Sequence, residues 1–74
     1  MAARLVFLGR LADLVGARTR EVAPGPLSAA LAGLPDDLLG PRVKLALNGA
    51  LVQAEGLVLA EGDELAFLPP VSGG

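Results

Sequence analysis

The strongest constraint on the fold is an alternating apolar segment that runs into an Asn-Gly dipeptide. Residues 43–47 read Val-Lys-Leu-Ala-Leu, so an extended strand places its larger aliphatic side chains on one face and Lys44 and Ala46 on the other. Asn48-Gly49 tolerates the positive φ angles that a tight hairpin turn requires. The sequence therefore predicts a hairpin in which residues 50–52 form the return strand.

Three further strands are predicted outside this hairpin. Residues 4–8 (Arg-Leu-Val-Phe-Leu) and residues 64–68 (Glu-Leu-Ala-Phe-Leu) are short apolar runs of strand length. Residues 18–22 alternate but carry several charges, which predicts an exposed edge strand that resists sheet-to-sheet aggregation.

Two helices complete the predicted fold. Aliphatic residues recur at helical spacing before Gly16, which suits the left-handed position that closes a helix. Pro26 is well placed as the first residue of a longer helix, with Leu27, Leu31 and Leu34 on one stripe and Pro35 at its end. The order of elements predicts an α+β fold in which one sheet packs against one main helix.

Composition excludes several classes of function. The 74 residues make one domain and include no Cys and no His, which removes disulfides, the usual nucleophile, the neutral-pH acid/base group and the commonest zinc ligands. We therefore expect no metal site and no self-sufficient catalysis. A net charge of −2 without a basic run or aromatic platforms argues against nucleic acid. No segment is apolar enough for a membrane span or a signal peptide, so the expected location is the cytoplasm.

The last residues of the chain carry the clearest functional signal. Gly73-Gly74 leaves a carboxylate without neighbouring side chains, which suits passage through a slot too narrow for a Cβ atom. Pro69 and Pro70 fix φ and favour an extended path, which at ~3.1 Å per residue would carry the terminus roughly 19 Å beyond the fold. We predict a folded domain over residues 1–68 and an extended reactive tail over residues 69–74. A frayed terminus is the alternative.

The charged residues have structural explanations. Asp36-Asp37 follows Pro35, where helix starts favour Asp, and adjacent residues do not share a helix face, so capping is preferred over a paired-carboxylate site. Asp63 and Glu64 fit a turn and an exposed strand face, with recognition by a partner as the alternative. The remaining cations are read as solvating charges because no Gly-rich phosphate loop accompanies them: Arg10, Arg18, Arg20, Arg42 and Lys44.

Several segments together resemble a known family. Residues 62–74 read Gly-Asp-Glu-Leu-Ala-Phe-Leu-Pro-Pro-Val-Ser-Gly-Gly, Asn48-Gly49 is followed by Leu51-Val52, and Phe7 precedes Leu-Ala-Asp-Leu-Val-Gly at 11–16. This pattern resembles the small subunit of molybdopterin synthase over nearly the whole chain. Related thiamine-pathway carriers share the Gly-Gly ending but generally lack the preceding Phe-x-Pro-Pro-Val-(Ser/Thr) segment.

The resemblance implies a fold and a chemistry. The family has the ubiquitin-like β-grasp fold, with the first and last strands parallel at the sheet centre, although residues 27–42 are shorter here than usual. An ATP-dependent enzyme would adenylate the carboxylate of Gly74, and a sulfur donor would then displace AMP to leave a thiocarboxylate. That group would donate sulfur to a pyranopterin precursor for the molybdenum cofactor. The residues implied in tail threading are Gly73, Ser72, Val71, Pro70 and Pro69.

The resemblance also implies partners. They are the large synthase subunit, in a heterotetramer, the adenylating enzyme and the sulfur donor. This chain would be a non-catalytic carrier that binds no cofactor itself, because ATP is used by the activating enzyme and the catalytic side chains belong to the large subunit.

A partner surface can be sought among apolar side chains that the core does not use. If Phe67 points inward, strand alternation turns Leu68 outward, and the same argument turns Leu8 outward. Parallel pairing of the first and last strands, which the β-grasp fold implies, brings the two leucines together where the tail leaves, and Leu51 joins them from the hairpin. The alternative is that scattered surface leucines are ordinary. The predicted partner interface is therefore Leu8, Leu51 and Leu68.

Three functional classes remain open at this point. The first is a sulfur carrier for molybdenum cofactor synthesis. The second is a carrier for another pathway, such as thiamine synthesis or tRNA thiolation, or a ubiquitin-like modifier joined to lysines through Gly74. The third is an interaction module with an inert tail.

Overall fold

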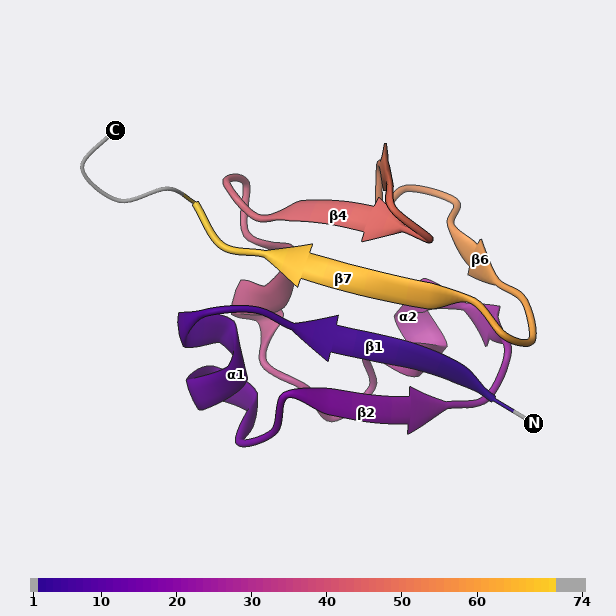
Figure 1. Ribbon diagram of the computed structural model, residues 1–74, viewed down its shortest axis with the longest axis horizontal. Helices are drawn as coiled ribbons and strands as arrows, with labels where there is room; N and C mark the ends of the chain where they lie inside the picture. Colours follow the sequence, from indigo (N-terminus) through magenta and orange to yellow (C-terminus); the bar gives the residue numbers. More distant parts are fainter. Residues whose placement is uncertain (1, 71–74) are drawn as a thin grey trace.

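A computed structural model describes residues 2–70 of the chain and shows a mixed sheet with short helices on one face (Figure 1). The five-stranded sheet has the order β2-β1-β7-β4-β5, and β3 and β6 form a separate two-stranded sheet. The strands are β1 (Ala3–Phe7), β2 (Thr19–Val22), β3 (Gly25–Pro26), β4 (Lys44–Leu47), β5 (Ala50–Val52), β6 (Val58–Leu59) and β7 (Glu64–Leu68). The helices are α1 (Arg10–Val15), α2 (Leu27–Ala30) and the 3-10 helix η1 (Asp36–Leu39).

The centre of the sheet is the parallel pair of β1 and β7. Leu5 lies beside Leu65 and Phe7 beside Phe67, whereas β1 pairs with β2, β4 with β7 and β4 with β5 in antiparallel register. The first and last strands of the chain therefore run side by side, as the resemblance implied. Because both strands run in the same direction, β7 ends beside the C-terminal end of β1, and the chain leaves the sheet there (Figure 1).

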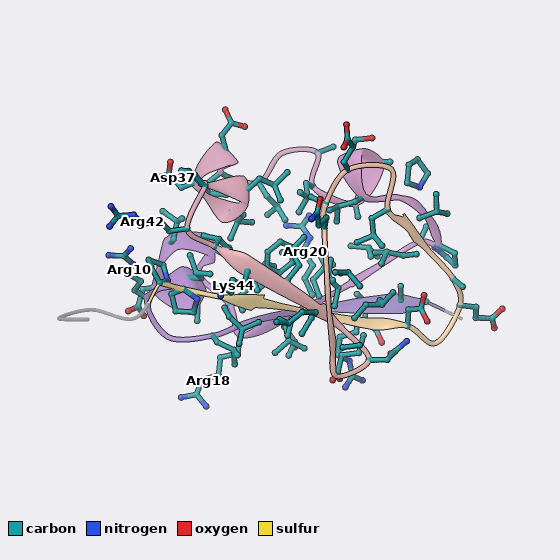
Figure 2. The ribbon with its side chains drawn as sticks, turned by 90° about the horizontal axis from the view of Figure 1, so that it is seen from above. Arg10, Arg18, Arg20, Asp37, Arg42 and Lys44 are labelled. Atoms are coloured by element: carbon teal, nitrogen blue, oxygen red, sulfur yellow. The ribbon has the colours of Figure 1, made fainter. Side chains whose placement is uncertain are left out.

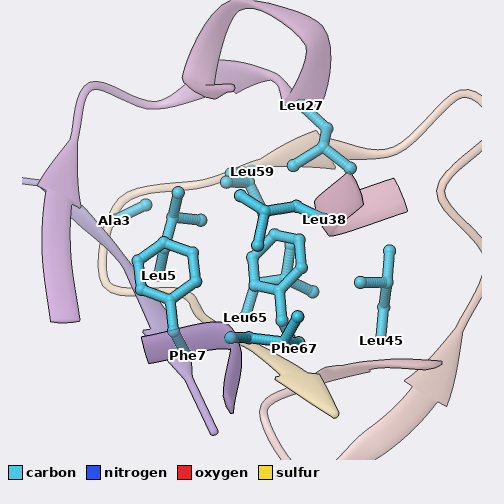
Figure 3. Close-up of a cluster of buried hydrophobic side chains, with 10 residues drawn as sticks. Ala3, Leu5, Phe7, Leu27, Leu38, Leu45, Leu59, Leu65 and Phe67 are labelled. Carbon is cyan, nitrogen blue, oxygen red and sulfur yellow. The ribbon is translucent and has the colours of Figure 1, made fainter. Parts of the chain in front are cut away.

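The core forms on one face of this central pair. The two phenyl rings of Phe7 and Phe67 stack with centroids 5.3 Å apart and planes 25° apart, an aromatic contact worth about 0.5–1.5 kcal/mol beyond area burial. Each helix contributes one buried leucine to the same core, namely Leu11 of α1, Leu27 of α2 and Leu38 of η1. Figure 3 labels Leu27 and Leu38 among these core side chains. The other buried residues are Ala3, Leu5, Leu45, Leu59 and Leu65.

Most predicted elements are confirmed, but the main helix is much shorter than expected. The helix predicted from Pro26 to Leu34 stops after the single turn of α2. Gly33 has φ +82°, a left-handed conformation that a right-handed helix cannot contain. Leu31 and Leu34 still pack against the core, but from the turn that follows α2. The sheet is thus covered by three short helices in place of one long helix.

Two details of the middle region also differ from expectation. Asp36 and Asp37 lie in the first turn of η1 as predicted, but Pro35 occupies the N-cap position and no side-chain capping hydrogen bond forms. The predicted capping role is therefore wrong. Strands β3 and β6 were not predicted; they pair with each other, with Gly25 opposite Leu59 and Pro26 opposite Val58.

A polar latch joins the hairpin turn to the turn before β7. Asn48 and Gly49 have φ values of +50° and +89°, which confirms the predicted turn. The Asn48 Nδ2 atom donates to Asp63 Oδ1 at 2.9 Å, and the Glu64 amide donates to Asn48 Oδ1 at 2.9 Å. The Ala60 amide donates to Asp63 Oδ2 at 2.8 Å. The hydrogen bond from Ala60, followed by that from Asn48, lowers the pKa of Asp63 below its ordinary value.

A close backbone approach fixes the root of the tail. Gly9 precedes α1 with φ +56° and ψ −135°, a conformation that L side chains rarely adopt. A Cβ atom at this position would lie 3.1 Å from Cγ of Pro69. Glycine at position 9 therefore lets Pro69 lie directly against the turn between β1 and α1.

We predict that the latch makes stability depend on acid pH. The folded state holds Asp63 with a lowered pKa, so its contribution is present at neutral pH and is lost as the pH falls from about 5 through the folded-state pKa. Asp63→Asn should reduce the free energy of unfolding at pH 7 and flatten its decline toward low pH. Asn48→Gly, which tolerates the positive φ, should also lower the free energy of unfolding, because it removes two hydrogen bonds of the latch. Urea unfolding across pH measures both.

Glu61→Gln, an exposed carboxyl in the same turn, is the matched control for Asp63→Asn. If Glu61→Gln and Asp63→Asn flatten the pH profile equally, the latch does not account for the acid sensitivity.

We predict that Gly9→Ala destabilises the fold by about 1–3 kcal/mol, because the new side chain is strained at this φ and ψ and displaces Pro69. Gly16→Ala is the control: its φ is +87°, but no atom lies within 4 Å of the added Cβ. Both variants should lower the thermal midpoint, and only Gly9→Ala should shift the NMR resonances of Pro69. Unchanged Pro69 resonances in Gly9→Ala would rule out the proposed contact.

Candidate functional site at the root of the tail

The tail leaves the fold beside the end of β1. The Leu8 amide donates to the Phe67 carbonyl at 3.2 Å, which extends the central pairing by one residue and places Leu8 next to Leu68. Pro69 and Pro70 follow and are half-buried. The predictions for Val71, Ser72, Gly73 and Gly74 lie outside the described residues and remain predictions, as does the boundary at residue 68.

The face of the sheet opposite the core gathers the three leucines predicted to bind a partner. Strand alternation turns Leu68 and Leu8 away from the core because Phe67 and Phe7 point into it. Leu51 lies on the same face of β5, since its neighbour Val52 packs against the core. Leu51 is 68% exposed and Leu8 is 40% exposed, whereas Leu68 is half-buried.

Sequence reasoning left three residues out of this face. Ala46 lies between Leu51 on one side and Ala66 on the other, and Ala66 in turn lies beside Val6. All three are half-buried, and they connect Leu51 to the leucines near the tail. Alternation within each strand already turned them outward, but their adjacency depends on the strand order, which places β4 between β7 and β5. We call this surface the outer face: Val6, Leu8, Ala46, Leu51, Ala66 and Leu68.

Charged side chains bound the outer face along the strands. Arg4 and Glu64, which lie side by side, form an ion pair at 3.8 Å, and both side chains are more than half exposed. A pair so exposed contributes about 0–1 kcal/mol to stability, so its main effect is to mark the polar end of the face. At the other end Lys44 lies beside Leu68. The apolar surface therefore lies between these two charged ends and reaches the root of the tail through Leu8 and Leu68.

The described residues offer a surface and no reactive constellation of side chains. Residues 2–70 bury no polar or charged side chain and include no group of three or more His, Cys, Asp or Glu side chains placed to hold a metal ion. Asp63, whose pKa is lowered, is used by the latch. No helix in this part of the chain has the length and apolarity to cross a membrane.

Comparison with known proteins identifies the same fold. SAMP1 from Haloferax volcanii is 28% identical, with a TM-score of 0.80 and full coverage of both chains. A subunit in the complex of subunits 1 and 2 of the molybdopterin-converting factor from Helicobacter pylori 26695 is 26% identical, with a TM-score of 0.68 and full coverage of both chains. The small archaeal modifier protein 1 from Methanosarcina acetivorans, at 18% identity and a TM-score of 0.73 over 97% of this chain and 95% of that one, shows the fold alone.

The family comparison agrees with the structural ones, whereas no curated protein sequence matches the chain. The model of the ThiS family matches residues 5–74, nearly the whole sequence. With the parallel central strands, the hairpin and the Gly-Gly ending already established, the conclusion is that this chain belongs to the ThiS family and has the ubiquitin-like β-grasp fold of ThiS- and MoaD-like sulfur carriers.

Proposed function

We propose that this protein is the sulfur-carrying small subunit of a molybdopterin synthase. The observation that carries the proposal is the parallel pairing of β1 and β7, which sets the apolar outer face beside the root of a tail that ends in Pro-Pro-Val-Ser-Gly-Gly. The relative from Helicobacter pylori, which is a subunit of a two-subunit molybdopterin-converting factor, supports this choice. The outer face would bind the large subunit while the tail enters its active site.

The chemistry would take place on the main chain at Gly74. A carboxylate oxygen attacks the α-phosphorus of ATP, pyrophosphate leaves, and the acyl adenylate provides AMP as a good leaving group. A sulfur donor then displaces AMP, so an acyl C–S bond replaces the C–O bond to phosphate. The resulting thiocarboxylate sulfur would attack the pyranopterin precursor within the large subunit, displace an oxygen substituent and form a thioester. Water then cleaves the acyl C–S bond, which leaves the sulfur on the precursor and returns the Gly74 carboxylate, and two such deliveries build a dithiolene. No side chain of this protein is needed as a nucleophile.

A second candidate function shares the activation step. The relative from Haloferax volcanii is SAMP1, an abbreviation for small archaeal modifier protein 1. Under that function an amine of a target lysine would attack the activated Gly74 carbonyl and form an isopeptide bond. Intact-mass measurement on protein from its native cells separates the two: replacement of one oxygen by sulfur indicates a carrier, whereas larger adducts indicate a modifier.

We predict that Leu68→Asp weakens binding of the large subunit and leaves the fold intact. The new carboxylate would have to be desolvated in an apolar interface, and burying a leucine there contributes about 1.5–3 kcal/mol, so affinity should fall at least about tenfold. Val58→Asp is the matched control, since Val58 is 63% exposed in β6, outside the outer face. Circular dichroism checks that the fold is intact, and a titration with the large subunit measures the affinity. Equal affinities for the two variants would remove Leu68 from the interface.

The test of the proposed function is the identity of the reacting residue. Deleting Gly74 leaves the carboxylate short by ~3.3 Å, and adding a residue presents the wrong group, so both variants should lose sulfur transfer. An error of about 1 Å already costs about a hundredfold in rate where reacting groups must be aligned. Gly73→Val keeps a competent carboxylate but should fail because its branched side chain obstructs a narrow channel.

These variants should unfold at nearly the wild-type temperature, because the buried core is formed by residues between Ala3 and Phe67 and none of the changes alters a core residue. The measurement is ATP-dependent adenylation and thiocarboxylate formation by mass spectrometry, with purified activating enzyme and sulfur donor. Wild-type rates of sulfur acquisition and dithiolene formation in the deleted and extended proteins would overturn the carrier assignment.

A further inference from the structure

The root of the tail has a second surface, on the side away from the outer face. A cleft of about 670 Å³ lies between α1 and the segment that leads from η1 into β4. Its apolar lining includes Leu11, Leu14 and Val43, and Leu14 is 43% exposed although it belongs to a helix that otherwise packs on the core. Pro70, the last described residue, also lines the cleft. The tail therefore starts at the edge of a hollow that no described segment of this chain fills. We call this hollow the root cleft.

Two guanidinium groups line the root cleft. Arg10 begins α1 and Arg42 lies just before β4, and both are exposed. Figure 2 shows both side chains projecting at the end of the molecule from which the tail departs. Within residues 2–70 the structure pairs only Arg4 with a carboxylate, so neither arginine has an ion-pair partner among them. Because the protein as a whole carries a charge of −2, these two cations give an acidic partner a local site on an otherwise unfavourable surface.

The lining of the root cleft also contains carboxylates, which argues against a general anion-binding site. Asp13 and Asp37 also line it, so a polyanion or a free phosphate would meet two carboxylates as well as two guanidinium groups. Such a mixed set favours a ligand with a single negative group in a fixed position and apolar atoms around it. A protein segment that carries one Asp or Glu beside an apolar side chain has this chemistry.

We propose that the root cleft receives such a segment from the enzyme that adenylates the tail, with the acidic group of the segment facing Arg10 and Arg42. The inference rests on the proposed function, because that function supplies an enzyme that must hold the tail. We choose the adenylating enzyme over the large synthase subunit as the partner in the cleft, because both the carrier function and the modifier function require activation of Gly74. A partner that covers the outer face alone leaves the cleft side of Pro70 open, whereas a contact in the root cleft adds binding energy beside the start of the tail.

The experiment measures adenylation kinetics of the full chain with the purified adenylating enzyme and ATP, by release of pyrophosphate. The variant that carries both Arg10→Glu and Arg42→Glu should raise the KM for this protein about tenfold or more, since like charges would face each other at the interface. The kcat at saturation should change little, because uniform binding is what is lost. For the wild type the KM should rise with salt, because salt screens the attraction, whereas for the charge-reversed variant the KM should fall with salt, because salt then screens a repulsion.

Arg20→Glu is the control, since it makes on β2 the charge change that the double variant makes at each of its two positions. Arg20 lies away from the root cleft, and Figure 2 labels it away from the tail root. Thermal unfolding of all variants verifies the fold, and the neutral pair Arg10→Gln with Arg42→Gln provides the same test if the reversed charges prevent folding. Adenylation of the wild type with equal KM values for the control and the double variant would overturn this inference and leave the proposed function standing. No adenylation of the wild type would overturn both.

Discussion

The parallel pairing of β1 and β7 is the constraint on which the rest of the structure depends. It joins the first and the last strand of the described chain, buries the stacked rings of Phe7 and Phe67 and points both strand ends toward the same edge. Because the two ends coincide, the turn after β1 supplies Gly9, against which Pro69 lies. The position of the tail root is therefore set by the most buried part of the fold, although the tail itself starts at the surface.

Short local segments could be predicted from the sequence because each contains its own signal. Alternation gave the strands, Asn48-Gly49 gave the hairpin, and Gly16 gave the end of α1, whose C-cap has φ +87°. The main helix was overestimated because Leu31 and Leu34 keep a helical spacing that also serves a compact turn. Gly33 decides between the two, because its left-handed φ ends the helical path, and a pattern of apolar residues does not reveal that conformation.

The parts of the site that were missed depend on contacts between distant segments. The latch joins Asn48 to Asp63, fifteen residues apart, and the role of Ala46 in the outer face follows from the strand order. The contact of Gly9 with Pro69 spans nearly the whole chain. Glycine, asparagine and alanine occur in many settings, so their identity carries little information until the fold brings the partners together. The outward leucines were easier to identify, because alternation alone separates them from the core.

Under the proposed function, the arrangement at the tail root explains how a small protein without Cys or His could take part in group transfer. If the reacting atom lies on the main chain at Gly74, the side chains are left to control where that atom is delivered. The outer face is apolar and lies on one side of the root, whereas the root cleft combines Leu14 with Arg10 and Arg42 on the other side. Apolar contact is insensitive to salt and nearly indifferent to partner identity, but the charges in the cleft favour one pattern over others. A carrier that passes between an activating enzyme and a synthase benefits from this division, because shared binding through one face does not prevent discrimination through the other.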